Sequence, residues 1–167
     1  VRGVPRHGVV VVGAGPAGLT AGIHLARAGI PHVVYERAEP GGLLRSAGLV
    51  ECYPGFPDGI PGSELRRAMV EQASRLGVRI ERAEVTAASW SRQGYQLLVE
   101  GAPVEAEVVI LATGTVPRPL SPDLIEGPLP GGRVHHGTAS LPEALEGARV
   151  WISGGGDAAF DSALQLR

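Results

Sequence analysis

The sequence predicts an α/β fold with a parallel sheet and a small antiparallel meander. Three observations carry this prediction. A run of β-branched residues, Val9–Val12, is followed by a glycine-rich turn and a helical stretch. The same order of strand, glycines and helix returns at 149–166. Between these two copies, segments 85–90 and 95–100 flank Gln93-Gly94 as the strands of a hairpin would.

The first strand and helix belong to a βαβ unit. Val9–Val12 reads as a short strand buried on both faces, because it has no polar position. Residues 17–28 read as a helix that ends before Gly29. The second strand covers 32–35 and ends at Glu36. Such units pair their strands in parallel through a right-handed connection.

The next elements follow from capping and periodicity. Ser63 is expected to cap a helix over 64–76, whose buried side carries Leu65, Met69 and Leu76. Residues 78–82 read as a strand, and 108–111 as another buried one.

The last third of the chain divides differently. Residues 115–147 are rich in proline and glycine and hold a short helix at 142–145. A strand over 149–153 and a helix over 157–166 follow. We therefore expect a first domain at 1–115, a linker at 116–147, and the first βα unit of a second domain at 148–167.

Composition excludes several function classes. The 167 residues are 44% hydrophobic, which suffices for one core, and the net charge of −2 argues against nucleic-acid binding. All 15 basic residues are arginine, which excludes a P-loop lysine or a Schiff-base lysine. A single cysteine excludes an internal disulfide and a zinc cluster, and favours a reducing, cytoplasmic setting.

The uncharged stretch from Gly8 to Ala26 resembles a signal peptide or a membrane span. Gly13, Gly15 and Pro16 would break a spanning helix in its middle, so a buried strand that turns into a helix fits better. No membrane association is predicted. Because the sequence lacks an initiator methionine, we expect a processed or partial chain.

The turn after the first strand carries the strongest motif. It reads Gly13-Ala14-Gly15-Pro16-Ala17-Gly18, a complete G-x-G-x-x-G between a strand and a helix. Backbone N–H groups and the helix dipole at such a turn attract a diphosphate, and the glycines permit its close approach. Glu36 stands at the end of the next strand, where an acidic residue binds a ribose hydroxyl. The combination predicts a dinucleotide site.

Further motifs follow in a fixed order. They read Gly41-Gly42-Leu43-Leu44, then Glu51–Pro57 (ECYPGFP), then Gly59–Leu65 (GIPGSEL), and finally Ala112-Thr113-Gly114. With Glu36, this series resembles the low-molecular-weight thioredoxin reductase family of two-dinucleotide flavoproteins, over nearly all of residues 8–166. The resemblance implies a Rossmann-like domain that binds FAD.

The resemblance also implies a role for each motif. Residues 13–18 would hold the FAD diphosphate and Glu36 its adenosine ribose, while Val85 would lie against the adenine. Leu43 and Cys52 stand where the family often has Gln and Asn. The candidate FAD-binding residues are Gly13, Ala14, Gly15, Pro16, Ala17, Gly18, Glu36, Arg37, Gly41, Gly42, Leu43, Leu44, Cys52, Val85, Ala112, Thr113 and Gly114.

A second glycine motif opens near the end of the chain. Gly154-Gly155-Gly156-Asp157-Ala158-Ala159 matches G-x-G-x-x-A, and by the same resemblance its first five residues would bind NADP or NAD. The residues that choose between these nucleotides would lie after the next strand, outside this sequence.

The lack of a C-x-x-C pair is informative. Thioredoxin reductases place a C-x-x-C pair shortly before the second glycine motif, where this chain has Gly137-Thr138-Ala139-Ser140. Cys52 has no partner, and a buried, inert thiol is expected. The local sequence is more similar to the thioredoxin-reductase-like ferredoxin–NADP reductases.

The sequence therefore predicts an FAD-dependent NAD(P)H oxidoreductase that exchanges electrons with ferredoxin or flavodoxin and has no catalytic side chain of its own. A low-molecular-weight disulfide or a quinone is the alternative acceptor. Another alternative is a cofactor-binding module, since the 167 residues alone are expected to lack steady-state activity. No metal is expected, and a homodimer is compatible with the family.

Overall fold

The computed structural model describes residues 3–116, 134–135, 138, 141 and 145–167. Contacts divide the chain into two compact units, one formed by 1–44 and 64–114 and the other by 45–63 and 115–167. The predicted helix at 142–145 and most of the predicted linker lie outside the described residues.

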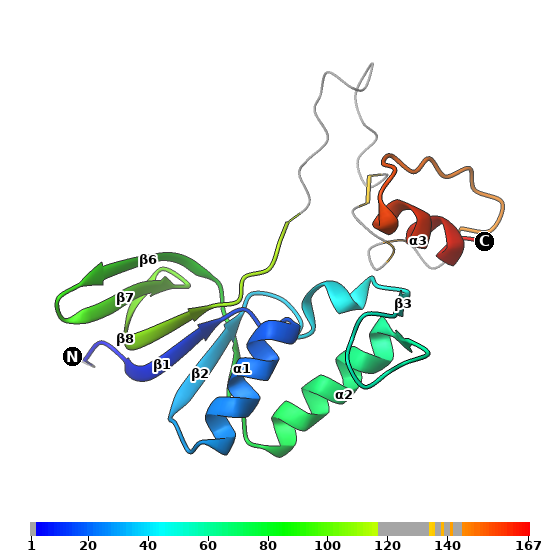
Figure 1. Cartoon of the computed structure of the whole chain (residues 1–167). Coiled ribbons are helices and arrows are strands. Elements are labelled where there is room, and N and C mark those ends of the chain that lie inside the picture. The colour runs from blue at the N-terminus through cyan, green and yellow to red at the C-terminus, as the bar shows by residue number, and fades with distance from the viewer. Residues whose placement is uncertain (1–2, 117–133, 136–137, 139–140, 142–144) are drawn as a thin grey trace, which may run out of the picture. The chain divides into compact units, whose positions relative to one another are not determined.

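The first unit is built on one mixed sheet (Figure 1). Among the described residues its strand order is β5-β2-β1-β8-β7-β6. The strands are β1 (Arg6–Val12), β2 (His32–Glu36), β5 (Ile80–Arg82), β6 (Val85–Ser91), β7 (Gly94–Val99) and β8 (Ala102–Leu111). β5, β2, β1 and β8 run parallel, whereas β8, β7 and β6 form an antiparallel meander. The predicted α/β fold with its small meander is confirmed.

Helix α1 (Pro16–Arg27) connects β1 to β2 and covers one face of the sheet (Figure 1). Its Leu19 and Ile23 are buried. A Cβ on Gly22 would lie 3.3 Å from Val34 Cγ2, so the helix approaches β2 closely at this glycine. Gly29 follows the helix with φ +68°, a conformation that glycine adopts without strain.

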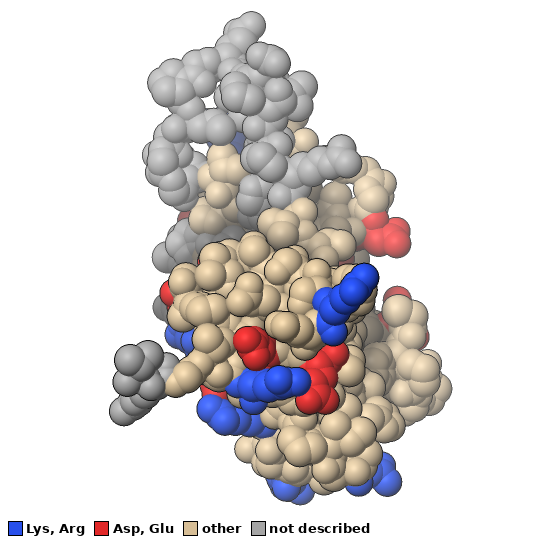
Figure 2. Space-filling model, turned by 90° about the vertical axis from the view of Figure 1, so that its left-hand side faces the viewer, with Lys and Arg blue, Asp and Glu red and all other residues tan. Residues whose placement is uncertain are grey.

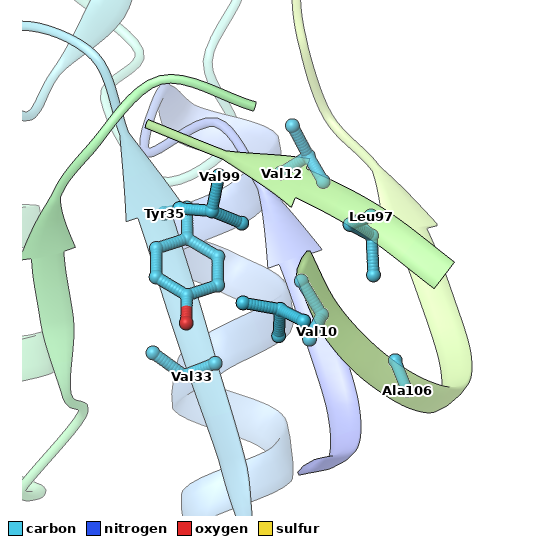
Figure 3. Packing of buried hydrophobic residues seen from close by; sticks show 8 residues of the cluster. Val10, Val12, Val33, Tyr35, Leu97, Val99 and Ala106 are labelled. Carbon is cyan, nitrogen blue, oxygen red and sulfur yellow. The ribbon is translucent and has the colours of Figure 1, made fainter. Parts of the chain in front are cut away.

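The core lies on the opposite face of β1 and β2 (Figure 3). Val10 and Val12 of β1 and Tyr35 of β2 pack there against the meander. The remaining members of this cluster are Val33, Leu97, Val99, Val104 and Ala106. Val10 and Val11 point to opposite faces, and each is 0% exposed. The prediction that this strand is buried on both faces is therefore confirmed.

Helix α2 (Gly62–Arg75) corrects two predictions. Leu65 and Met69 are buried as expected, but Leu76 is 40% exposed because the helix ends one residue earlier. Ser63 lies inside the first turn rather than before it, since Gly62 already begins the helix. The predicted cap at Ser63 is therefore wrong.

The second unit contains little regular structure among its described residues. It includes two short paired strands, β3 (Leu49–Val50) and β4 (Ile60–Pro61), and helix α3 (Asp157–Gln165). The short helix η1 (Gly42–Arg45) spans the boundary between the units. The predicted strand over 149–153 is not formed. A strand needs a hydrogen-bonded neighbour, and no described segment pairs with it.

The surface carries acidic and basic side chains close together, as the face in Figure 2 illustrates. Exposed ion pairs such as Arg82–Glu39, at 3.4 Å, contribute roughly 0–1 kcal/mol each. None of the described helices is long and apolar enough to cross a membrane.

Candidate functional site

The glycine-rich turn joins β1 to α1 at the carboxyl end of the parallel strands (Figure 1). Gly13 has φ +101°, and a Cβ there would lie 2.3 Å from the carbonyl oxygen of Ala112. A Cβ on Gly18 would lie 1.8 Å from the carbonyl oxygen of Gly13. Both positions therefore require glycine, the first for its conformation and its contact with Ala112, the second for close packing of the helix.

The amino end of α1 is left open. Gly15 is the N-cap and supplies no side-chain hydrogen bond, and Pro16 occupies the first turn. A Cβ on Gly15 would meet its nearest neighbour, Gly42 Cα, only at 3.8 Å. Among the described residues no acceptor for the N–H groups of Ala17 and Gly18 is found. These donors and the helix dipole together suit an anion such as a diphosphate.

Glu36 ends β2 beside this turn. Its Oε2 accepts a hydrogen bond from the Ala14 N–H at 2.7 Å, and its Oε1 accepts one from the Ala38 N–H at 2.9 Å. The carboxylate is therefore fixed at the edge of the glycine turn. Each carboxylate oxygen retains a second lone pair, so the group can still accept hydrogen bonds from two neighbouring hydroxyls.

The glycine turn forms one wall of the site, and the segment after β2 forms the second wall. The Gly41 N–H donates to the Ala14 carbonyl oxygen at 2.8 Å, which ties this segment to the glycine turn. A Cβ on Gly42 would lie 3.1 Å from Gly15 Cα, so the two glycines face each other closely. Leu44 is buried, whereas Leu43 is exposed. The structure thus brings Gly41 and Gly42 to the turn.

Two further segments reach the same edge of the sheet. Ala112, after β8, donates its N–H to Val12 and lies against Gly13 and Gly18, with Thr113 and Gly114 next in the chain. On the other side, the Ala83 N–H donates to the Glu36 carbonyl oxygen, and Val85 follows at the start of β6. Arg37 pairs with Glu84 at 3.9 Å, with both side chains largely exposed.

The other predicted residues belong to the second unit. Cys52 is exposed, which corrects the expectation of a buried thiol. It lies in the loop between β3 and β4, where residues 51–57 line an open hollow of about 330 Å³ that leaves the thiol accessible. Gly156 is the N-cap of α3, and neither it nor Gly155 has a neighbour within 4 Å of a Cβ position.

The second glycine motif has the predicted turn and helix, but not the predicted strand before them. Gly154 has φ +133°, and Asp157 and Ala158 form the first turn of α3. On this helix the apolar side chains of Phe160 and Leu164 are 67% and 71% exposed.

Comparison with known proteins supplies the family. The model of the pyridine nucleotide-disulphide oxidoreductases matches residues 7–167. The chain belongs to this family. The resemblance to thioredoxin reductases is likewise confirmed. The chain is 38% identical over 167 residues to the bifunctional thioredoxin reductase/thioredoxin of Mycobacterium leprae, covering 96% of this chain and 35% of that protein.

Solved structures agree with this assignment. Thioredoxin reductase from Lactococcus lactis superposes with a TM-score of 0.64 at 32% identity, over 75% of this chain and 39% of that one. A ferredoxin-flavin thioredoxin reductase from Clostridium acetobutylicum gives 0.63 at 28%, over 71% and 41%. The match confirms the Rossmann-like fold. The present chain spans well under two thirds of the length of these relatives.

Sequence reasoning missed one residue at the site. Arg66, on α2, donates its Nε–H to the Pro40 carbonyl oxygen at 2.7 Å and covers Gly41. The glycine pair signalled a close approach at this point, but nothing in the sequence indicated which side chain approaches it.

Proposed function

We propose that this chain supplies the FAD-binding site of an FAD-dependent NAD(P)H oxidoreductase. The observation that carries the proposal is the fixed Glu36 carboxylate, hydrogen-bonded to Ala14 in the glycine turn of a chain that belongs to this family. An acidic group locked beside an open helix N-terminus suits a nucleotide in which a ribose adjoins a diphosphate.

The geometry of the first unit supports this ligand. The open N–H groups of Ala17 and Gly18 would bind the diphosphate, and Glu36 would accept from the ribose hydroxyls. The adenine would then lie toward Val85, on the Ala83 side of β2, because that segment follows Glu36 along the sheet edge. Gly41, Gly42 and Leu43 would line the way to the flavin ring, near Thr113 and Gly114.

When bound, FAD would supply the redox chemistry, taking up a hydride from NAD(P)H and returning electrons to an acceptor. The contribution of the chain is to bind and orient the cofactor. No side chain in the described site needs to act as a general acid or base.

The second glycine motif supports a nicotinamide nucleotide as the partner substrate. Gly154, Gly155 and Gly156 lead into α3, whose first turn holds Asp157 and Ala158. NADP or NAD is proposed to bind there. In this proposal residues 1–115 belong to the FAD domain, 116–147 link it to the next, and 148–167 begin the nicotinamide domain.

The acceptor is proposed to be external to this chain. Its relatives are named thioredoxin reductases, but the chain holds one cysteine, Cys52, and no C-x-x-C before its second glycine motif. Electrons would therefore pass directly from the flavin to ferredoxin or flavodoxin. A quinone or a low-molecular-weight disulfide is the alternative acceptor, and thioredoxin itself is the acceptor that the names of the relatives suggest. A cytoplasmic homodimer is compatible with this function.

Two measurements test the proposal. The polypeptide made from the whole coding frame is titrated with FAD, and Glu36→Gln is compared with Glu107→Gln, whose carboxylate makes an exposed pair with Arg6. We expect a flavin spectrum with the unaltered protein and with Glu107→Gln, and weaker binding by Glu36→Gln. Absence of bound flavin in the unaltered protein would refute the proposal.

The acceptor is then identified by stopped-flow reoxidation of the NADPH-reduced protein. We expect reoxidation by ferredoxin or flavodoxin to exceed that by quinones, thioredoxin and small disulfides. Faster reoxidation by a quinone or disulfide would select the alternative acceptor. FAD binding by the 167 residues without NADPH oxidation would favour a cofactor-binding module.

A further inference from the structure

Arg66 contacts the site from a helix that is distant in sequence. Its Nε–H donates to the Pro40 carbonyl oxygen at 2.7 Å. Its stem lies over Gly41, because a Cβ there would be 2.5 Å from Arg66 Cγ and 2.6 Å from Cδ. Gly41 has φ +118°, so this residue has both a conformational and a spatial reason to be glycine.

The turn that Arg66 holds is itself attached to the diphosphate loop. Gly41 donates its N–H to the Ala14 carbonyl oxygen at 2.8 Å, and Gly42 faces Gly15. Arg66 therefore stands behind the second wall of the site, bonded to Pro40 and in contact with Gly41, the residue that donates to Ala14. Loss of its hydrogen bond would release Pro40 and allow the Gly41-Gly42 turn to move away from Gly15.

The positive charge of Arg66 matters because of what surrounds the glycine loop. The loop 13–18 has no ionised side chain, and the Ala14 N–H is already bonded to Glu36. A diphosphate brings negative charge beside that carboxylate. Arg66 has no ion-pair partner within the part of the chain that the structure describes. Its guanidinium is positively charged and offers further N–H donors besides Nε.

We propose that Arg66 is a positioning residue for the bound dinucleotide. It holds the Pro40–Gly42 turn against the glycine loop, and its positive charge favours the diphosphate. The inference rests on the proposed FAD site. Arg66 acts through the turn and needs no direct contact with the cofactor.

The test compares Arg66→Met with Arg67→Met. Methionine keeps an apolar stem over Gly41 but removes the donors and the charge, and Arg67 is an exposed neighbour on α2. FAD affinity and the thermal midpoint with and without FAD are measured on the polypeptide made from the whole coding frame. We expect Arg66→Met to raise the Kd for FAD by about tenfold, as for loss of a charged hydrogen bond. Its FAD-induced rise in thermal midpoint should shrink, whereas Arg67→Met should match the unaltered protein.

Arg66→Lys provides a second variant. It keeps the charge and a flexible stem but loses the planar Nε–H donor, so we expect a Kd about threefold above that of the unaltered protein. An unchanged FAD-induced rise in thermal midpoint for Arg66→Met would overturn the inference, as would an equal loss in Arg67→Met. If the unaltered protein binds no FAD, the proposed function fails first. If it binds FAD and both Arg66 variants bind equally well, only this inference fails.

Discussion

Gly18→Ala tests the close approach of α1 to the glycine turn. The added Cβ would lie 1.8 Å from the Gly13 carbonyl oxygen, 2.9 Å from the Gly13 carbonyl carbon and 3.4 Å from Ala112 Cβ. A carbon rests no nearer than about 3.3 Å to a carbonyl oxygen, so the helix must move by roughly 1.5 Å. The obstacle is backbone, which cannot rotate aside as a side chain would.

The energetic cost follows from this displacement. Overpacking of a close contact costs about 1–3 kcal/mol, and the rigid partner favours the upper end. The higher helix propensity of alanine returns about 1 kcal/mol. We therefore expect a net loss of about 2 kcal/mol in the free energy of unfolding. A shift of the helix would also misplace the N–H donors of Ala17 and Gly18, raising the Kd for FAD at least tenfold by the usual value of about 1.5–3 kcal/mol for each charged hydrogen bond.

Gly8→Ala is the matched control. Gly8 lies in β1, and its Cβ would meet the Pro31 carbonyl oxygen at 3.5 Å, an ordinary contact. Urea unfolding followed by circular dichroism, together with FAD titration, distinguishes the two variants. We expect Gly8→Ala to change stability by less than about 1 kcal/mol. Equal stability and equal FAD affinity in the two variants would refute the reasoning from the Gly18 contact.

Three further predictions concern single side chains. Glu36→Ala should raise the Kd for FAD more than Glu36→Gln does, because glutamine can still accept a hydrogen bond from Ala14; equal titrations of the two would count against the role of this acceptor. Burial, and secondarily the Glu81 carboxylate, raises the pKa of Tyr35 above its ordinary 10.0. The folded state then holds the phenol proton more tightly than the unfolded state, so this contribution to stability is full below pH 10 and declines above it. Tyr35→Phe should flatten the fall in stability above pH 10, measured by urea unfolding, and an unchanged slope would contradict this. Cys52 is exposed, so Ellman's reagent should titrate one thiol per chain without denaturant; no reaction would show that the thiol is covered.

The parallel strands and the first helix could be predicted because local signals agreed with one another. Val9–Val12 has a β-branched pattern that favours a buried strand, and the glycines after it favour a tight turn. The position of Glu36 at a strand end was enough to predict its carboxylate at the turn. The hydrogen bond to Ala14 was not predicted, because it depends on how the backbone of the turn is oriented.

The incorrect and missed predictions depend on spatial neighbours that the local sequence does not identify. Residues 149–153 have the apolar character of a strand, but a strand is defined by its neighbours, and none of the described segments pairs with it. Cys52 was expected to be buried from the average behaviour of cysteine, whereas its loop offers too little cover. Arg66 lies 25 residues beyond Gly41 in the sequence, and only the packing of α2 shows that the two touch.

The bond between Glu36 and Ala14 has a consequence for the kinetics of cofactor uptake. The protein itself holds both groups in position, with Glu36 at the end of β2 and Ala14 two residues after the end of β1, and these two strands pair with each other. Little conformational entropy then remains to be lost at this end of the site when a nucleotide arrives. The rate at which the adenosine end of FAD binds should be governed by diffusion and charge. Any slow step in FAD binding should be the placement of the isoalloxazine ring.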